Sequence, residues 1–203
     1  MIYQAIKLVC EQLNQYFIDE IGEDGTYVKP GNIALIDAKT EGNGAPGNAN
    51  GQEEGILATL VNMQEEKVLK NQPAYAIRDT EKVVYENPPI ILNLYLLFAA
   101  VDGNYDKALV YLANVIAFFQ GKRSFTNLNT PIRSDLSPPV RDMEQFKIIM
   151  DLYSPSFEEA NYLWGTLGGK QYPYALYRMR VTPVSRTQKK EIRGVIKEVS
   201  IND

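Results

Sequence analysis

The chain has 203 residues, 45% of them apolar, and carries a formal net charge of −4 with an isoelectric point near 5.1. This length and apolar share favour one large domain with a sizeable core, and the acidic balance excludes a broad basic surface for nucleic acid. The chain contains no histidine. Histidine-based triads and zinc sites that contain histidine are therefore excluded, and we expect no catalytic site, no metal, no cofactor and no nucleic-acid partner.

The first segment predicts an amphipathic helix over residues 2–20. Its apolar residues recur at helical spacing, and Gly22 ends the pattern. Its polar side comprises Lys7, Glu11, Asn14 and Gln15. The only cysteine, Cys10, falls on the apolar side of this helix, and we interpret it as a core thiol, with a reactive thiol as the alternative.

The N-terminus lacks the long apolar stretch that is typical of a secretory signal. A single cysteine cannot form a disulfide within the chain, so the sequence does not indicate an oxidising compartment. The most apolar run, 90–101, is far shorter than the roughly 20 residues of a membrane span. We therefore expect a soluble protein that is made in the cytoplasm and has no membrane span.

Residues 27–63 predict short strands around a loop. The first strand, 27–36, is interrupted by Pro30 and Gly31, and the second covers 56–63. Between them, residues 37–54 are rich in Gly, Asn and Ala and predict a mobile loop, because such a composition buries little apolar surface. A weak β segment follows at 75–85.

The uninterrupted apolar run over 90–100, which follows Pro88 and Pro89, predicts a central strand covered on both faces. A buried helix is the competing interpretation. Asn104 is a plausible N-cap for a second amphipathic helix over 105–120.

The C-terminal half alternates between extended and helical patterns. Residues 122–142 contain three prolines and predict an extended connection, and 146–152 and 172–181 predict strands. Ser156 and Glu159 have the spacing of a capping box and predict a short helix between these strands, ending toward Gly168. The polar end of the chain contains a weak strand at 195–201.

Together these elements predict an α+β fold, with a mostly antiparallel sheet flanked by helices, over one domain of residues 1–184. Residues 185–203 form a basic C-terminal tail. This tail is either a solvated end or an arm that contacts an acidic partner. The candidate contact residues are Arg186, Lys189, Lys190, Arg193 and Lys197.

Two motifs that suggest ligand binding fail at decisive positions. Asp102-Gly103-Asn104 resembles the start of a calcium loop, but position six is Lys107 rather than glycine and position twelve is Ala113 rather than glutamate. The segment 165–170 resembles a phosphate-binding loop, but Trp164 stands where the spacing requires glycine and Gln171 stands where it requires serine or threonine. We interpret the first as a helix start and the second as a helix end.

Aromatic residues make up 10% of the chain, and thirteen of them are tyrosines. Core packing explains such a share, and so does an extensive interface. Paired carboxylates such as Glu158-Glu159 are adjacent along the chain and point apart, so an acid–base pair has no positive support.

Five segments in the same order resemble the cap, or tail-terminator, proteins of phage-tail-like extracellular contractile injection systems of the antifeeding-prophage and virulence-cassette type. They are MIYQA (1–5), LVNMQEE (60–66), PPIILNLYLLFAA (88–100), YDKAL with FFQG (105–109 and 118–121), and SFEEANYLWGTLGG (156–169). The resemblance runs from residue 1 to about residue 182 and leaves out the basic tail.

The resemblance implies a fold like that of phage tail terminators and a structural, non-enzymatic role. Six copies would form a ring that terminates the inner tube and anchors the last sheath layer, so the implied partners are the chain itself, the tube protein and the sheath protein. Assembly would occur in the cytoplasm, within a particle that is then released. The rival functions are a tube or baseplate adaptor in the same machine and a small enzyme that uses dispersed carboxylates.

Overall fold

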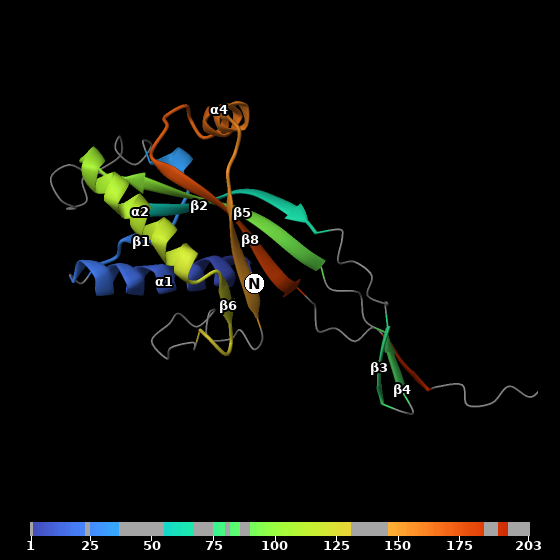
Figure 1. Cartoon of the computed structure of the whole chain (residues 1–203). Coiled ribbons are helices and arrows are strands. Elements are labelled where there is room, and N and C mark those ends of the chain that lie inside the picture. The colour runs from blue at the N-terminus through green and yellow to red at the C-terminus, as the bar shows by residue number, and fades with distance from the viewer. Residues whose placement is uncertain are drawn as a thin grey trace, which may run out of the picture.

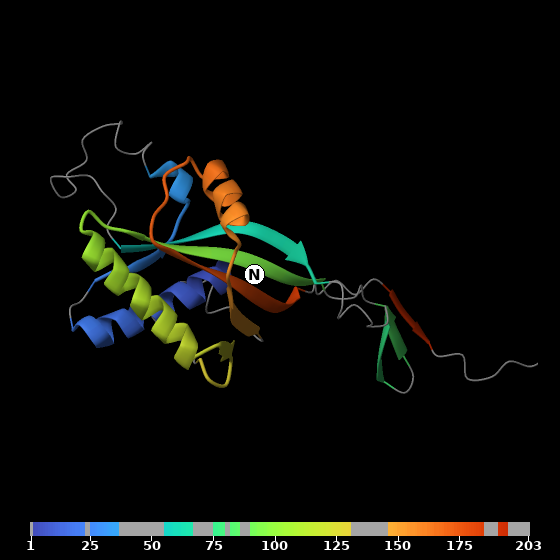
Figure 2. The ribbon, with the colours of Figure 1, turned by 45° about the horizontal axis from the view of Figure 1, so that its top comes forward.

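The computed structural model describes residues 2–22, 25–36, 55–66, 75–79, 82–85, 90–130, 146–184 and 191–194 (Figure 1). Its main element is a curved six-stranded sheet with helices on both faces (Figures 1 and 2). The predicted loop at 37–54 and the predicted strand at 195–201 lie outside the described residues, as does most of the predicted connection after residue 130.

The strand order in this sheet is β1-β2-β5-β8-β7-β6. The strands are β1 (Val28–Pro30), β2 (Gly55–Glu65), β5 (Ile90–Val101), β8 (Tyr174–Val184), β7 (Lys147–Tyr153) and β6 (Ser124–Thr126). Every neighbouring pair is antiparallel except β1 and β2, which run parallel. The predicted α+β class with a mostly antiparallel sheet is confirmed.

The apolar run after the two prolines forms β5, in the middle of the sheet between β2 and β8. Leu96 and Phe98 are fully buried on one face, and Leu97 and Ala99 are fully buried on the other. Because successive side chains of a strand point to opposite faces, an uninterrupted apolar run suits a strand that is covered on both sides. The competing helix interpretation is wrong.

Helices α1 (Ile2–Ile21) and α2 (Tyr105–Gly121) pack on the first of these faces, and α4 (Phe157–Thr166) packs on the second with the short helix η1 (Ile33–Leu35) (Figure 2). The larger core lies between the sheet and the helix pair. Cys10 of α1 is 1% exposed in this core, which confirms that it is a core thiol.

The predicted helix ends are confirmed by their hydrogen bonds. The Asn104 side chain accepts from the N–H groups of Asp106 (3.0 Å) and Lys107 (3.3 Å), so the calcium-like segment is a helix start. Ser156 and Glu159 form both bonds of a capping box at the start of α4. The N–H of Gly169 donates to the backbone carbonyl oxygen of Trp164 at 2.8 Å, so the segment that resembles a phosphate loop is a helix end.

The structure corrects two details of the sequence analysis. Strand β6 lies inside the stretch that was predicted to be an extended connection, and it pairs with β7 although it is only three residues long. Asn14 is on the predicted polar side of α1, but its amide binds the backbone of β1 rather than water.

A second, three-stranded sheet has the order β3-β4-β9. Its strands are β3 (Tyr75–Asp79), β4 (Lys82–Tyr85) and β9 (Glu191–Gly194), and both pairs are antiparallel. The predicted β segment at 75–85 is therefore a hairpin. Strand β9 belongs to the stretch that was predicted to be a basic tail, and it lies just before the strand predicted at 195–201.

Candidate functional site

The outer face of α2 is apolar although it faces solvent. From Ala108 to Gly121 the helix contains no charged residue. Leu109 (42% exposed), Val110 (57%) and Ile116 (41%) point outward along this stretch, together with the exposed alanines 113 and 117. Because solvent-facing helix surfaces normally carry charged residues, this face has the composition of a surface that another protein covers.

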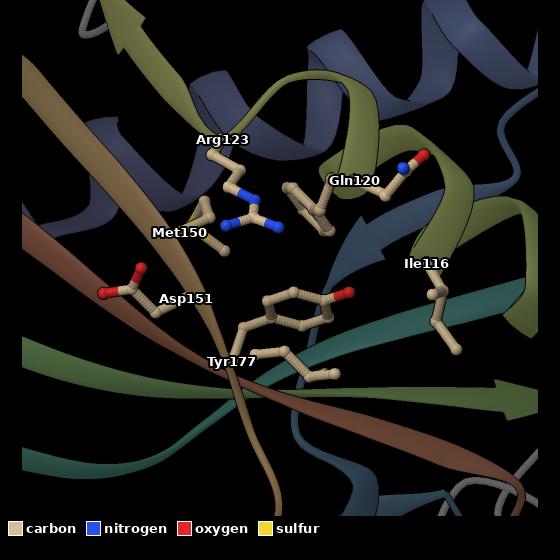
Figure 3. A pocket seen from close by; sticks show the side chains of 8 residues that line it. Ile116, Gln120, Arg123, Met150, Asp151 and Tyr177 are labelled. Atoms are coloured by element: carbon tan, nitrogen blue, oxygen red, sulfur yellow. The ribbon is translucent and has the colours of Figure 1, made fainter.

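A pocket of about 310 Å³ lies at the C-terminal end of this face, between α2 and strands β7 and β8 (Figure 3). Phe119, Met150 and Tyr177 form its floor and are each at most 3% exposed. Ile116 and Leu152 line it at the surface, where Leu152 is 57% exposed. The pocket is thus an apolar and aromatic hollow that continues the outer face of α2.

The acidic and basic side chains that line this pocket differ in whether they already have an ionic partner. Asp151 is engaged within the sheet, because Arg178 contacts its carboxylate at 3.3 Å and Arg180 contacts it at 3.9 Å. The Arg123 side chain forms no hydrogen bond or ion pair with any described residue, and its guanidinium points into the pocket toward Tyr177 (Figure 3). Burial raises the pKa of the Tyr177 hydroxyl, and the charge of Arg123 acts in the opposite direction. Among the described lining residues, the charge that lacks an ionic partner is therefore the positive charge of Arg123.

A second hollow, of about 410 Å³, lies on the opposite face of the sheet beside α4. Tyr95 and Tyr153 meet edge to face across it, with ring centroids 5.4 Å apart, and Tyr162 of α4 also lines it. The Tyr153 hydroxyl donates to Glu159 at 3.2 Å, and the charge of Glu159 raises the pKa of that hydroxyl. This groove combines aromatic walls with polar tips, which is typical of interfaces.

The described residues bring together no constellation that indicates catalysis. They include no group of three or more Cys, Asp and Glu side chains that could hold a metal ion. Burial raises the pKa of the Cys10 thiol to about 12, so this thiol stays protonated and unreactive at neutral pH. No helix within the described ranges is both long enough and apolar enough to cross a bilayer.

The predicted contact residues of the tail remain a prediction. Arg186, Lys189, Lys190 and Lys197 lie outside the described residues. Arg193 lies in β9, where its backbone is paired with Val83 of β4. Of these five residues, the structure therefore describes only the backbone of Arg193, as part of the β3-β4-β9 sheet.

The outer face of α2 and its pocket were not singled out in the sequence. A signal was present, because a helical stretch as long as Ala108 to Gly121 without a single charged residue is unusual for a surface helix. The pocket itself could not be predicted, since it depends on how α2 crosses β7 and β8.

The sequence matches the family described as the Pvc16 N-terminal domain over residues 6–198. The chain belongs to this family. The match continues to residue 198 and so includes most of the basic tail, which corrects the expectation that the resemblance ends near residue 182. The predicted resemblance to tail terminators of contractile injection systems is confirmed. No curated protein matches the sequence.

Among solved structures, the Pvc16 N-terminal-domain fold seen here is similar to a sheath/tube terminator of an extracellular contractile injection system, called PVC, in its extended state. The TM-score is 0.59 at 12% identity, over 100% of this chain and 63% of that chain. The tube-terminating cap of the anti-feeding prophage also matches, with a TM-score of 0.49 at 14% identity, over 74% of this chain and 50% of that chain. The chain therefore spans less than two thirds of the length of either structure.

Proposed function

We propose that this protein is a structural cap subunit of a contractile injection system. In this role, copies form a ring that terminates the inner tube and anchors the last sheath layer. The observation that carries the proposal is the family match over residues 6–198, joined with a fold that is similar along the whole chain to a sheath/tube terminator.

The geometry supports this role because a ring subunit needs a rigid body and two different contact surfaces. The six-stranded sheet, packed on both faces, supplies the body. The outer face of α2 with its pocket and the groove beside α4 supply two unlike surfaces on opposite faces of that sheet. Such work requires no catalytic group, and we propose that the protein is not an enzyme.

The number of subunits, the partners and the location complete the proposal. Six copies form the ring, and its partners are the tube protein and the sheath protein. The particle assembles in the cytoplasm and is then released. Within the chain, residues 1–184 form the cap domain, and the basic residues of 185–203 contact an acidic surface of a neighbouring subunit or of the sheath.

Deletion of the gene, with complementation by the intact chain, tests the role. Particles that lack the protein should have tubes of uncontrolled length, or sheaths that detach or contract early, and complementation should restore both. Electron microscopy of purified particles provides tube lengths and sheath states. Particles of normal length and stability in the deletion strain would show that the proposal is wrong.

A further inference from the structure

We infer that neighbouring copies in the ring join by insertion of Phe157 of one copy into the pocket between α2 and β7 of the next. The inference rests on the proposed function, because it assigns the contact between copies of the cap. The contact uses two different surfaces of each copy and one pair of opposite charges.

Phe157, the first residue of α4, is 98% exposed although it is a large aromatic residue at the start of a capped helix. The capping box of Ser156 and Glu159 fixes the backbone on both sides of it, so its side chain is presented from a rigid position. Because little side-chain or loop entropy is lost when such a group binds, it suits the anchor of an interface.

The pocket has the matching size and chemistry. Its volume of about 310 Å³ is large enough for a phenyl ring, and its floor contains the aromatic rings of Phe119 and Tyr177 beside the thioether of Met150. Aromatic pairs and contacts between sulfur and aromatic rings are each favourable beyond simple burial of area. The pocket should therefore bind a phenylalanine side chain more favourably than an apolar pocket without aromatic rings or sulfur would.

The charges around the two surfaces are complementary. Glu158 is exposed next to Phe157 and accepts one hydrogen bond, from the Tyr162 hydroxyl at 3.3 Å. At the pocket, Arg123 has no ion-pair partner among the described residues. Within the described part of the chain, Asp151 is the one carboxylate that lines the pocket, and it already contacts Arg178 and Arg180. An incoming carboxylate beside the aromatic ring would thus meet a cation rather than a second acid.

The anchor and the pocket lie on opposite faces of the sheet. Helix α4 packs against the face that carries Leu97 and Leu176, whereas the pocket floor belongs to the core on the α1–α2 side. The two contact surfaces of each copy therefore differ. A contact between unlike surfaces is head to tail, and repeated copies then close into a ring when the rotation allows it.

Cross-linking between marked copies tests the contact directly. Asn161 is exposed one helical turn after Phe157, and Gln120 is exposed at the pocket. We expect particles that contain both Asn161→Cys and Gln120→Cys copies to yield a covalent dimer with a short bismaleimide, and a chain carrying both changes to yield a ladder. The native Cys10 is buried and does not compete.

Two controls accompany this experiment. Leu35→Cys, at an exposed position of η1 on the same sheet face as α4, should give no dimer with Gln120→Cys. Phe157→Ser in the Asn161→Cys chain should reduce the dimer at least tenfold. Particles that carry the protein at the tube end but yield no dimer would overturn the inference while leaving the cap role intact. Absence of the protein from that end would instead contradict the cap role.

Charge reversal supplies the second test. Arg123→Glu and Glu158→Arg should each lower the amount of protein retained on purified particles at least tenfold, and the double variant should return to within about threefold of the unaltered protein. Lys147→Glu changes the charge equally at an exposed position of β7 and should have no effect. Equal loss in the double variant and in the single variants would overturn the pairing.

Discussion

The side-chain amide of Asn14 binds both backbone groups of Val28. Its oxygen accepts from the Val28 N–H at 2.7 Å, and its NH₂ group donates to the Val28 carbonyl oxygen. The same oxygen accepts from the N–H of Tyr27 at 2.9 Å. Because β1 lies at the edge of the sheet, one helix side chain thus takes the place of a neighbouring strand and closes that edge.

Replacement of Asn14 by alanine should destabilise the protein by about 2–4 kcal/mol, because three hydrogen bonds are lost and partly buried backbone groups remain unpaired. Urea unfolding followed by circular dichroism measures this difference. Asn114→Ala is a matched control on α2, where the asparagine makes no hydrogen bond with a described residue; it should change the free energy of unfolding by less than about 0.5 kcal/mol. Equal effects of the two substitutions would contradict the assignment.

The Cys10 thiol should make stability fall with rising pH. Burial raises its pKa from 9.0 to about 12, so above pH 9 the unfolded chain loses a proton that the folded chain keeps. This favours the unfolded state by up to about 1.4 kcal/mol per pH unit between the two values. Denaturant unfolding from pH 8 to 10.5 should show a steeper fall for the unaltered protein than for Cys10→Ala. Parallel curves would mean that the thiol ionises as readily in the folded protein.

The outer face of α2 should tolerate a charge in the isolated chain but not in the particle. Val110→Lys is predicted to change the free energy of unfolding by less than about 0.5 kcal/mol, because the side chain is more than half exposed. It should nevertheless reduce retention of the protein on purified particles. Glu20→Lys, at an exposed position of α1, is the control and should be retained normally. Normal retention of Val110→Lys would mean that this face stays in water.

The basic residues beyond 184 should act by electrostatic attraction. The test variant replaces four basic residues by glutamine, Arg186, Lys189, Lys190 and Lys197, and does not alter the sequence of β9. It should lower retention of the protein on particles at about 0.1 M salt, where charges interact over roughly 10 Å. At 1 M salt the screening length is about 3 Å, and the variant and the unaltered protein should then behave alike. Equal retention at low salt would mean that these residues are only a solvated end.

Elements that are determined by residues close together in the chain could be predicted from the sequence. The run that forms β5 and the caps at Asn104 and Ser156 depend on neighbouring residues, so periodicity and cap chemistry sufficed for them. The sheet order could not be predicted in this way. Strand β6 is too short for a pattern, and β9 becomes a strand through pairing with β4, more than 100 residues earlier in the chain.

The candidate site was harder to predict than the fold. The tail residues stood out as a charge cluster, whereas the pocket assembles Phe119, Met150 and Tyr177 from three elements that only the tertiary structure brings together. Phe157 has no distinguishing sequence signal, because its neighbours Ser156 and Glu159 explain the local pattern by themselves. Its near-complete exposure became informative only once α4 had a place on the sheet.

The most direct test of the cap role is cryo-electron microscopy of particles that carry a tagged copy of this chain. We predict a ring of six copies at the end of the tube opposite the baseplate, in contact with the last layer of the sheath. Tag density at the baseplate end, or spread along the tube, would contradict it.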